Sequence, residues 1–288
     1  MSHVLGAKFR PTEVSLCRYR RYLGLLGLQA LVLAAASHLL MGQSAAPSPR
    51  VGPVHGVLVL DGGPEATPAV AQRFVELAGG DHARIVLIPS AAGDEFARDP
   101  ATLVLYRKLF GPKCCTILHT TQRSIADKPE FVEPLSTATG VWVVGGQTNV
   151  LPDIYWHTAT ERALRALLER GGVVGGSSAG AVIQGSQIPT VHRDNGFGLL
   201  RNTLIIAHLN RNNARGILVG AVAENPQIIG IGISEKTAAI VTGDQLEVAG
   251  EGDVVIADGQ SHEGKPFLVL GPGARFELKP RGRDAYRK

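Results

Sequence analysis

The chain contains little cysteine, and its cysteines lack the spacing of a metal site. Three occur in 288 residues. Cys17 lies near the N-terminus, and Cys114 and Cys115 are adjacent, so no pair is separated as in a structural zinc site. Alternation along a strand would send the side chains of Cys114 and Cys115 to opposite faces, which favours free thiols. We expect neither a metal nor another cofactor.

The main part of the chain also lacks net charge. The whole protein carries +4 at pH 7, and the five Lys or Arg side chains of residues 1–46, set against one Glu, account for all of it. The balanced charge of residues 47–288 argues against a nucleic-acid partner. This stretch shows no internal repeat and no linker, so we interpret it as one globular domain.

Residues 1–46 have the organisation of an export leader. The basic segment Arg18–Tyr22 precedes an apolar stretch from Leu23 to Met41, and the small residues Ser44–Ala46 follow. This order is typical of a signal peptide cleaved just before Pro47. An uncleaved membrane anchor is the alternative, because the apolar stretch is close to the minimum length that spans a bilayer. We expect an exported protein, periplasmic or extracellular, that touches a membrane only if the leader is retained.

Short apolar runs alternate with helical patterns after the leader. The runs, bounded by glycine or polar residues, predict buried strands. Their alternation with helices predicts an α/β fold of three layers, α/β/α, with a mostly parallel sheet and antiparallel strands towards the C-terminus. Ligands bind such sheets at the carboxyl ends of the strands. The expected strands lie at 57–60, 84–89, 114–118, 140–146, 173–174 and 203–207, and the closing ones at 228–233, 237–241, 245–248, 253–257, 267–270 and 274–278.

One glycine-rich stretch in this pattern predicts a catalytic serine. The strand Val173–Val174 continues into Gly176-Ser177-Ser178-Ala179-Gly180, which has the form G-x-S-x-G. In this motif the serine occupies a sharp turn between strand and helix, and its hydroxyl projects from the edge of the sheet. We infer that Ser178 is a nucleophile and that the Ala179 N–H is one oxyanion donor. An ordinary tight turn is the alternative.

A serine nucleophile needs a base, an orienting acid and a second oxyanion donor. His208 follows an apolar strand, at the edge where Ser178 should emerge, whereas His192 lies in a polar loop. Asp194 is the only acid between Ser178 and His208 and is therefore the candidate third member, with a distant carboxylate as the alternative. Gly146, in a glycine pair that ends another strand, is the candidate second donor.

Five blocks of the chain match a known family in order and spacing: Val143-Val-Gly-Gly146, Gly176-Ser-Ser-Ala-Gly-Ala181, Gly196-Phe-Gly-Leu-Leu200, the strand ending at His208, and Gly230-Ile-Gly-Ile-Ser-Glu-Lys-Thr-Ala238. Together the blocks resemble the cyanophycinase and peptidase E family of serine hydrolases, the cyanophycinase branch most closely. The resemblance extends over most of residues 55–260. It implies a sheet related to class I glutamine amidotransferases and attack by Ser178, with His208 as base, on the β-aspartyl-arginine links of cyanophycin, an arginine-decorated polyaspartate.

Positions that the resemblance assigns to substrate binding depart from the cyanophycinase pattern. Cyanophycinases carry Asp-Gln before the histidine, where this chain has Ile206-Ala207, and a glutamine in the glycine turn, where Thr148 stands beside Gln147. The arginine-rich stretch after the histidine is reduced to Arg211. We expect Gln147, Thr148 and Arg211 to contact a cyanophycin-like or other aspartyl-linked peptide, and substrate preference to have moved away from cyanophycin itself.

Two other functions remain as alternatives at this stage. One is an exported relative that binds ligands without cleaving them. The other is an α/β-hydrolase esterase, a fold that generally needs more than the 30 residues found here between serine and histidine. The sequence leaves a homodimer open.

Overall fold

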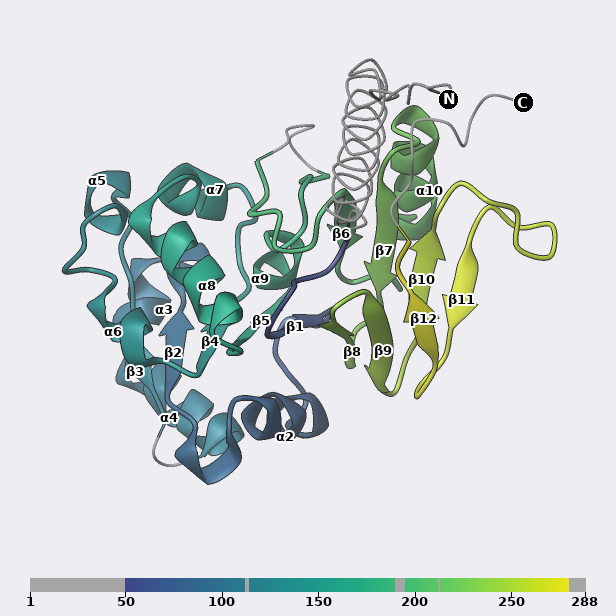
Figure 1. Ribbon diagram of the computed structural model, residues 1–288. Coiled ribbons are helices and arrows are strands. Elements are labelled where there is room, and N and C mark those ends of the chain that lie inside the picture. Colours follow the sequence, from purple (N-terminus) through teal and green to yellow (C-terminus); the bar gives the residue numbers. More distant parts are fainter. Residues whose placement is uncertain (1–49, 112–113, 190–194, 212, 280–288) are drawn as a thin grey trace, which may run out of the picture. The chain divides into compact units, whose positions relative to one another are not determined.

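The computed structural model describes residues 50–111, 114–189, 195–211 and 213–279 (Figure 1). From Arg50 onward the described residues form one compact unit. The expected leader, residues 1–46, and Asp194 lie outside the described residues, so cleavage before Pro47 stays a prediction. Within the described part, no helix has the length and apolar character needed to cross a membrane.

Eight strands form one large sheet in the order β12-β9-β8-β1-β5-β4-β2-β3. The five strands from β1 to β3 in this order run parallel to their neighbours, whereas β8, β9 and β12 extend the sheet in antiparallel pairs. The predicted mostly parallel sheet with antiparallel C-terminal strands is thus confirmed. The bounds are β1 (Val57–Asp61), β2 (Ile85–Ile88), β3 (Thr116–Ile117), β4 (Gly140–Val143), β5 (Val173–Ser177), β8 (Thr237–Thr242), β9 (Gln245–Gly250) and β12 (Arg275–Glu277).

Helices cover both faces of this sheet. On one face, α2 and α4 pack over a cluster of Phe74, Phe110 and Trp142, whose ring centroids lie 5.0 to 5.3 Å apart. Both helices begin with a capping side chain, Thr67 or Asp99, that is followed by proline, a sequence that favours a helix start. On the other face lie α7, α8 and α9. The bounds are α2 (Pro68–Leu77), α3 (Asp94–Arg98), α4 (Pro100–Phe110), α5 (Arg123–Ala126), α6 (Glu133–Thr137), α7 (Val150–Tyr155), α8 (Ala159–Glu169), α9 (Ala179–Val182) and α10 (Ala214–Glu224), with short 3₁₀ helices η1 (Gly80–His82) and η2 (Ser90–Ala92).

A second sheet of four strands, in the order β11-β10-β7-β6, was not expected from the sequence. Its strand β7 alternates isoleucine with glycine, and the isoleucines join the core of the large sheet. On the opposite face, the missing side chains of Gly230 and Gly232 leave room for Leu218 of α10, which covers this sheet (Figure 1). The second sheet therefore forms a layer between the large sheet and α10. The bounds are β6 (Thr203–Ile206), β7 (Ile229–Ile233), β10 (Val254–Ala257) and β11 (Leu268–Leu270).

The two adjacent cysteines lie just before β3. The sulfur atoms of Cys114 and Cys115 lie next to each other, so the prediction that their side chains point to opposite faces is wrong, whereas free thiols stay a prediction. Strand alternation does not apply to them, because β3 begins only at Thr116.

The carboxyl ends of β1, β5, β4 and β2 meet at one edge of the large sheet, since these strands are parallel. The second sheet is tied to this edge by His208, two residues beyond the end of β6: its N–H donates to the Gly62 carbonyl just beyond β1, at 2.9 Å. The fold therefore places the ends of β6 and β7 beside the end of β5, where the predicted nucleophile lies.

Candidate active site

Ser178 occupies the turn between β5 and α9 with a strained backbone. Its φ of 50° and ψ of −115° are uncommon for a residue other than glycine. The flanking glycines are required by close packing: a Cβ on Gly176 would lie 2.5 Å from the Gly180 carbonyl oxygen, and one on Gly180 would lie 2.0 Å from that of Val143. The Ser178 N–H donates to the Asp61 carbonyl at 3.0 Å, which fixes the turn to β1. This is the geometry that the G-x-S-x-G pattern predicts.

His208 connects Ser178 to a carboxylate. Its Nε2 lies 2.9 Å from Ser178 Oγ, and its Nδ1 lies 2.7 Å from Glu235 Oε1. Because a carboxylate can only accept, Nδ1 carries the ring proton and Nε2 can accept the serine proton. The side chains of His208 and Glu235 are 22% and 25% exposed, so the pair is shielded but reachable. The arrangement has the three parts of a nucleophile, a base and an orienting acid.

Glu235 is the residue that reasoning from the sequence missed. The sequence predicts Asp194, the only acid between Ser178 and His208, and this residue lies outside the described part of the chain. The structure brings a distant carboxylate to His208, which is the alternative to Asp194. A usable signal was present: Glu235 follows the last residue of β7 by two positions, just as His208 follows the last residue of β6, and these strands pair in parallel.

Arg211 lies against the acid of this site. Its Nη2 is 2.6 Å from Glu235 Oε1, the same oxygen that faces His208, and its own backbone N–H donates to the His208 carbonyl. The side chain is 59% exposed, so its remaining N–H groups are accessible from outside. Expected as a substrate contact, Arg211 thus also holds the Glu235 carboxylate.

The predicted oxyanion donors border Ser178. Ala179 is the first residue of α9, so its N–H has no acceptor within the helix. A Cβ on Gly145 would lie 3.1 Å from that of Ser178, which places the Gly145-Gly146 turn beside the nucleophile. Within the described residues, neither glycine of this turn donates its N–H to another backbone group. Gln147 and Thr148 follow in the same turn, the former exposed and the latter half-buried.

A second serine and histidine pair occurs at the ends of β2 and β3. Ser90 Oγ lies 3.0 Å from His119 Nδ1, and His119 Nε2 lies 2.8 Å from Asp94 Oδ1. Ser90 is only 1% exposed, and its hydroxyl also contacts Tyr155 OH at 2.6 Å. A buried hydroxyl with two partners cannot reach a substrate carbonyl. Ser178, which lies on a strained, partly exposed turn beside the N–H groups of Ala179 and Gly146, is therefore the candidate nucleophile.

Asp61 is a buried acid directly behind the nucleophile. It is fully buried at the end of β1, and burial raises its pKa to about 7 from 3.8, although a hydrogen bond from the Gly63 N–H to Oδ1 opposes the shift. Its other oxygen has no hydrogen-bond partner among the described residues. The Asp61 carbonyl accepts a hydrogen bond from the Ser178 N–H, and the Gly62 carbonyl accepts one from the His208 N–H. The segment Asp61–Gly62 therefore supports both residues.

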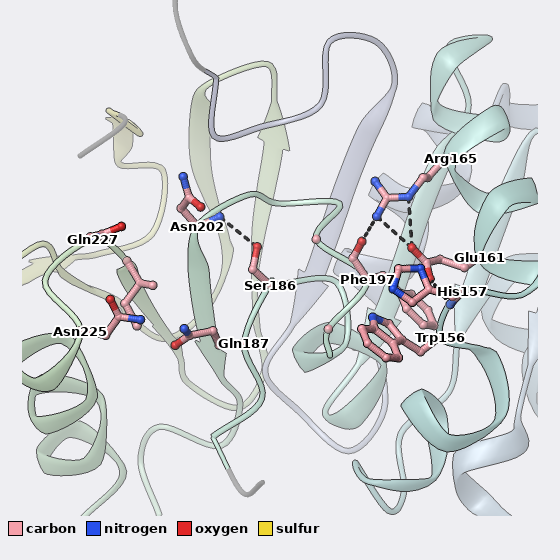
Figure 2. Close-up of a pocket in the computed structure, with 13 residues that line it drawn as sticks. Trp156, His157, Glu161, Arg165, Ser186, Gln187, Phe197, Asn202, Asn225 and Gln227 are labelled. Atoms are coloured by element: carbon pink, nitrogen blue, oxygen red, sulfur yellow. Dashed lines mark hydrogen bonds and ion pairs between the residues drawn. The ribbon is translucent and has the colours of Figure 1, made fainter. Parts of the chain in front are cut away.

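The pocket drawn in Figure 2 lies away from this site. It has a volume of about 450 Å³. Arg165, Glu161 and Phe197 gather on one side of it, and Asn202 and Gln227 on the other (Figure 2). The last two residues precede β6 and β7, whereas His208 and Glu235 follow these strands. The pocket therefore opens at the amino ends of the strands that carry the base and the acid at their carboxyl ends.

Comparisons with known proteins agree with this geometry. The model of peptidase family S51 matches residues 58–249. A cyanophycinase from Geminocystis herdmanii is 28% identical over 221 residues, which cover 71% of this chain and 81% of that protein. A cyanophycinase from Nostoc sp. is 30% identical over 262 residues, covering 78% of this chain and 86% of that one.

A solved structure is also similar. The crystal structure of a peptidase from an acI-B1 Actinobacterium is 26% identical with a TM-score of 0.62, covering 78% of this chain and 97% of that chain. Together these findings confirm the resemblance that the sequence blocks indicated.

Proposed function

The chain belongs to peptidase family S51 and is a serine-type peptidase, and on this premise we propose that Ser178, His208 and Glu235 are its catalytic triad. We further propose that it hydrolyses aspartyl-linked peptides outside the cytoplasm. The observation that carries the proposal is the pair of hydrogen bonds that runs from Ser178 through the His208 ring to Glu235. These hydrogen bonds join the Ser178 hydroxyl, which lies on a strained and accessible turn, to the His208 ring, whose tautomer is set by Glu235.

The proposed reaction is acyl transfer. Ser178 Oγ bonds to the substrate carbonyl carbon while His208 Nε2 takes the hydroxyl proton, and the carbonyl electron pair moves to oxygen. The resulting oxyanion accepts hydrogen bonds from the N–H groups of Ala179 and Gly146. Collapse breaks the C–N bond, and His208 returns its proton to the leaving amine. Water then attacks the acyl ester with His208 as base again, the ester C–O bond breaks, and His208 returns the proton to Ser178 Oγ, which releases the acid product. Glu235 orients the His208 ring and stabilises the imidazolium in both steps.

The substrate class rests on the relatives and on residues beside the triad. Proteins named as cyanophycinases are similar over most of this chain. Gln147, Thr148 and the outer N–H groups of Arg211 lie near the triad and are the proposed contacts to the peptide. Because Ile206-Ala207 replace the Asp-Gln of cyanophycinases, we propose a related aspartyl-linked peptide rather than cyanophycin as the preferred substrate. Export is proposed from the leader pattern alone.

A panel of substrates tests this function. The purified protein is incubated with cyanophycin, with β-aspartyl and α-aspartyl dipeptides and with a p-nitrophenyl ester, and products are followed by mass spectrometry. Ser178→Ala should lower kcat roughly 10⁴- to 10⁶-fold, as in another serine protease triad. Ser177→Ala is the matched control: it makes the same change one residue earlier, at a buried hydroxyl without a partner among the described residues, and should be mild.

Three results would contradict the proposal. Binding of the peptides without cleavage would favour a ligand-binding relative. Turnover of the ester alone would favour an esterase. Cleavage that survives Ser178→Ala would remove the proposed nucleophile, and with it the mechanism.

A further inference from the structure

A chain of four polar side chains crosses from the surface into the core beside the active site. Asp94 begins α3, Ser90 begins η2, His119 follows β3, and Tyr155 ends α7. Asp94 Oδ1 lies 2.8 Å from His119 Nε2, His119 Nδ1 lies 3.0 Å from Ser90 Oγ, and Ser90 Oγ lies 2.6 Å from Tyr155 OH. The proposed reaction uses none of these groups.

The direction of each hydrogen bond follows from the acid at the outer end. The Asp94 carboxylate can only accept, so His119 carries its proton on Nε2. His119 Nδ1 then accepts the proton of Ser90, and Ser90 Oγ in turn accepts from the Tyr155 hydroxyl. Ser90 and Tyr155 are each 1% exposed, so water cannot replace a lost partner without opening the core. His119 thereby determines which way two buried hydroxyls point.

These four side chains adjoin Ala91, whose carbonyl supports the predicted oxyanion turn Gly145–Gln147. The Gln147 N–H donates to the Ala91 carbonyl at 2.9 Å, and a Cβ on Gly146 would lie 2.1 Å from the same oxygen. On its other side the turn meets Ser178, as the 3.1 Å approach at Gly145 shows. The Gly145–Gln147 turn is therefore enclosed between Ala91 of η2 and the nucleophile.

Ser90 contacts or adjoins both segments that fix this turn: Ala91, which accepts from Gln147, and α7, which follows the turn in the chain. It precedes Ala91 in the chain, and through Tyr155 it contacts α7, the helix into which the turn leads. A shift of Ser90 would therefore move the Ala91 carbonyl and α7 together. Oxyanion donors lose their effect when displaced by a fraction of an ångström, so a small shift here has a large effect on rate.

We propose that His119 is a positioning residue for catalysis, which acts through Ser90 to hold the Gly145–Gln147 turn against Ser178. The role of that turn as oxyanion donor rests on the proposed function. The ring nitrogen that performs this positioning is Nδ1, which faces the core and accepts from Ser90. The Asp94 contact at Nε2 selects the tautomer but does not touch the turn.

Two substitutions of His119 test the hydrogen bonds of its two ring nitrogens separately. His119→Asn can place an amide oxygen where Nδ1 stands and keep the Ser90 bond while losing the Asp94 bond. His119→Gln can keep the Asp94 bond while losing the Ser90 bond. We expect His119→Asn to stay within about threefold of the original kcat and His119→Gln to lose about 10- to 100-fold, as for a displaced catalytic group. The loss in His119→Gln should fall mainly on kcat, because the Gly146 N–H acts on the transition state.

The matched control is His82→Gln, the same substitution at an exposed histidine in η1, which should leave kinetics unchanged. Hydrogen exchange of the backbone amides of residues 144–149 gives a second readout that needs no substrate. Exchange there should be faster in His119→Gln than in His119→Asn, with residues 57–61 of β1 unchanged as the internal reference.

The outcomes separate this proposal from the proposed function. Equal kcat and equal exchange for the two His119 variants would overturn the positioning role. A loss confined to KM would overturn it too, since it would assign His119 to substrate binding. If the original protein cleaves no aspartyl-linked peptide, the proposed function fails, and the exchange difference alone decides whether His119 positions the turn.

Discussion

Asp61→Asn should stabilise the protein at neutral pH and have little effect in acid. Asp61 is fully buried at the end of β1, and burial raises its pKa to about 7, with the Gly63 N–H bond as the opposing influence. Ionisation therefore leaves a charge in the core with one oxygen that has no partner among the described residues. Asparagine keeps the acceptor for the Gly63 N–H and carries no charge at any pH.

The size of the effect follows from the difference between the folded and unfolded pKa. Below the unfolded value of 3.8, Asp61 is protonated in both states and costs nothing. Between 3.8 and about 7 the folded state keeps its proton while the unfolded state releases one, so stability falls by about 1.4 kcal/mol per pH unit. Above pH 7 the loss is complete at about 4 kcal/mol, the product of that slope and a difference of about three units.

Urea unfolding at pH 5 and pH 8 measures this difference. With a denaturant slope of about 3 kcal/mol per molar, the midpoint of Asp61→Asn should exceed that of the original protein by about 1 M at pH 8. The excess at pH 5 should be less than half as large. Asp81→Asn, which removes the same formal charge from an exposed position in η1, is the control and should shift neither midpoint. An Asp61→Asn midpoint at pH 8 equal to or below the original would refute the reasoning.

Four other predictions concern catalysis and processing. Ser178→Ala and His208→Ala should each remove most activity, and the double variant should be little worse than either, because a triad works as a unit; additive losses in steady-state kinetics would contradict this. Glu235→Gln should lower kcat by roughly 10⁴-fold, as when a triad acid can no longer hold the right tautomer, whereas Asp194→Asn should have little effect, and the reverse result would make Asp194 the acid. The exported protein should begin near Pro47 by intact mass, and a full-length product in the membrane fraction would indicate an anchor instead. Activity on cyanophycin should fall below that of a cyanophycinase assayed in parallel, by about 5- to 150-fold for each hydrogen bond left unmade, so equal kinetics would show the altered positions to be unimportant.

The nucleophile turn could be predicted from sequence because its constraints are local. A five-residue motif requires glycine at two positions, and the structure shows why, since a side chain at Gly176 or Gly180 would collide with backbone. The parallel strands could be predicted for a similar reason: buried runs between helical patterns have few other arrangements. The second sheet could not be predicted, because the alternation of isoleucine and glycine in β7 indicates only that one face of this strand carries no side chains. That Leu218 of α10 packs against this face depends on the tertiary structure and not on the local sequence.

The proposed acid of the triad could be located only once two strands were known to pair. Chain order gives no guide, because unrelated serine hydrolases place serine, histidine and acid in different orders, and here the proposed acid follows the histidine. What the chemistry requires is that three side chains converge, and paired parallel strands bring together residues that lie a short distance beyond their ends. Ile206 pairs with Gly232, so His208 and Glu235 leave the same edge within one residue of each other in register. A search for the acid that starts from the partner strand of the histidine would therefore have reached Glu235 before Asp194.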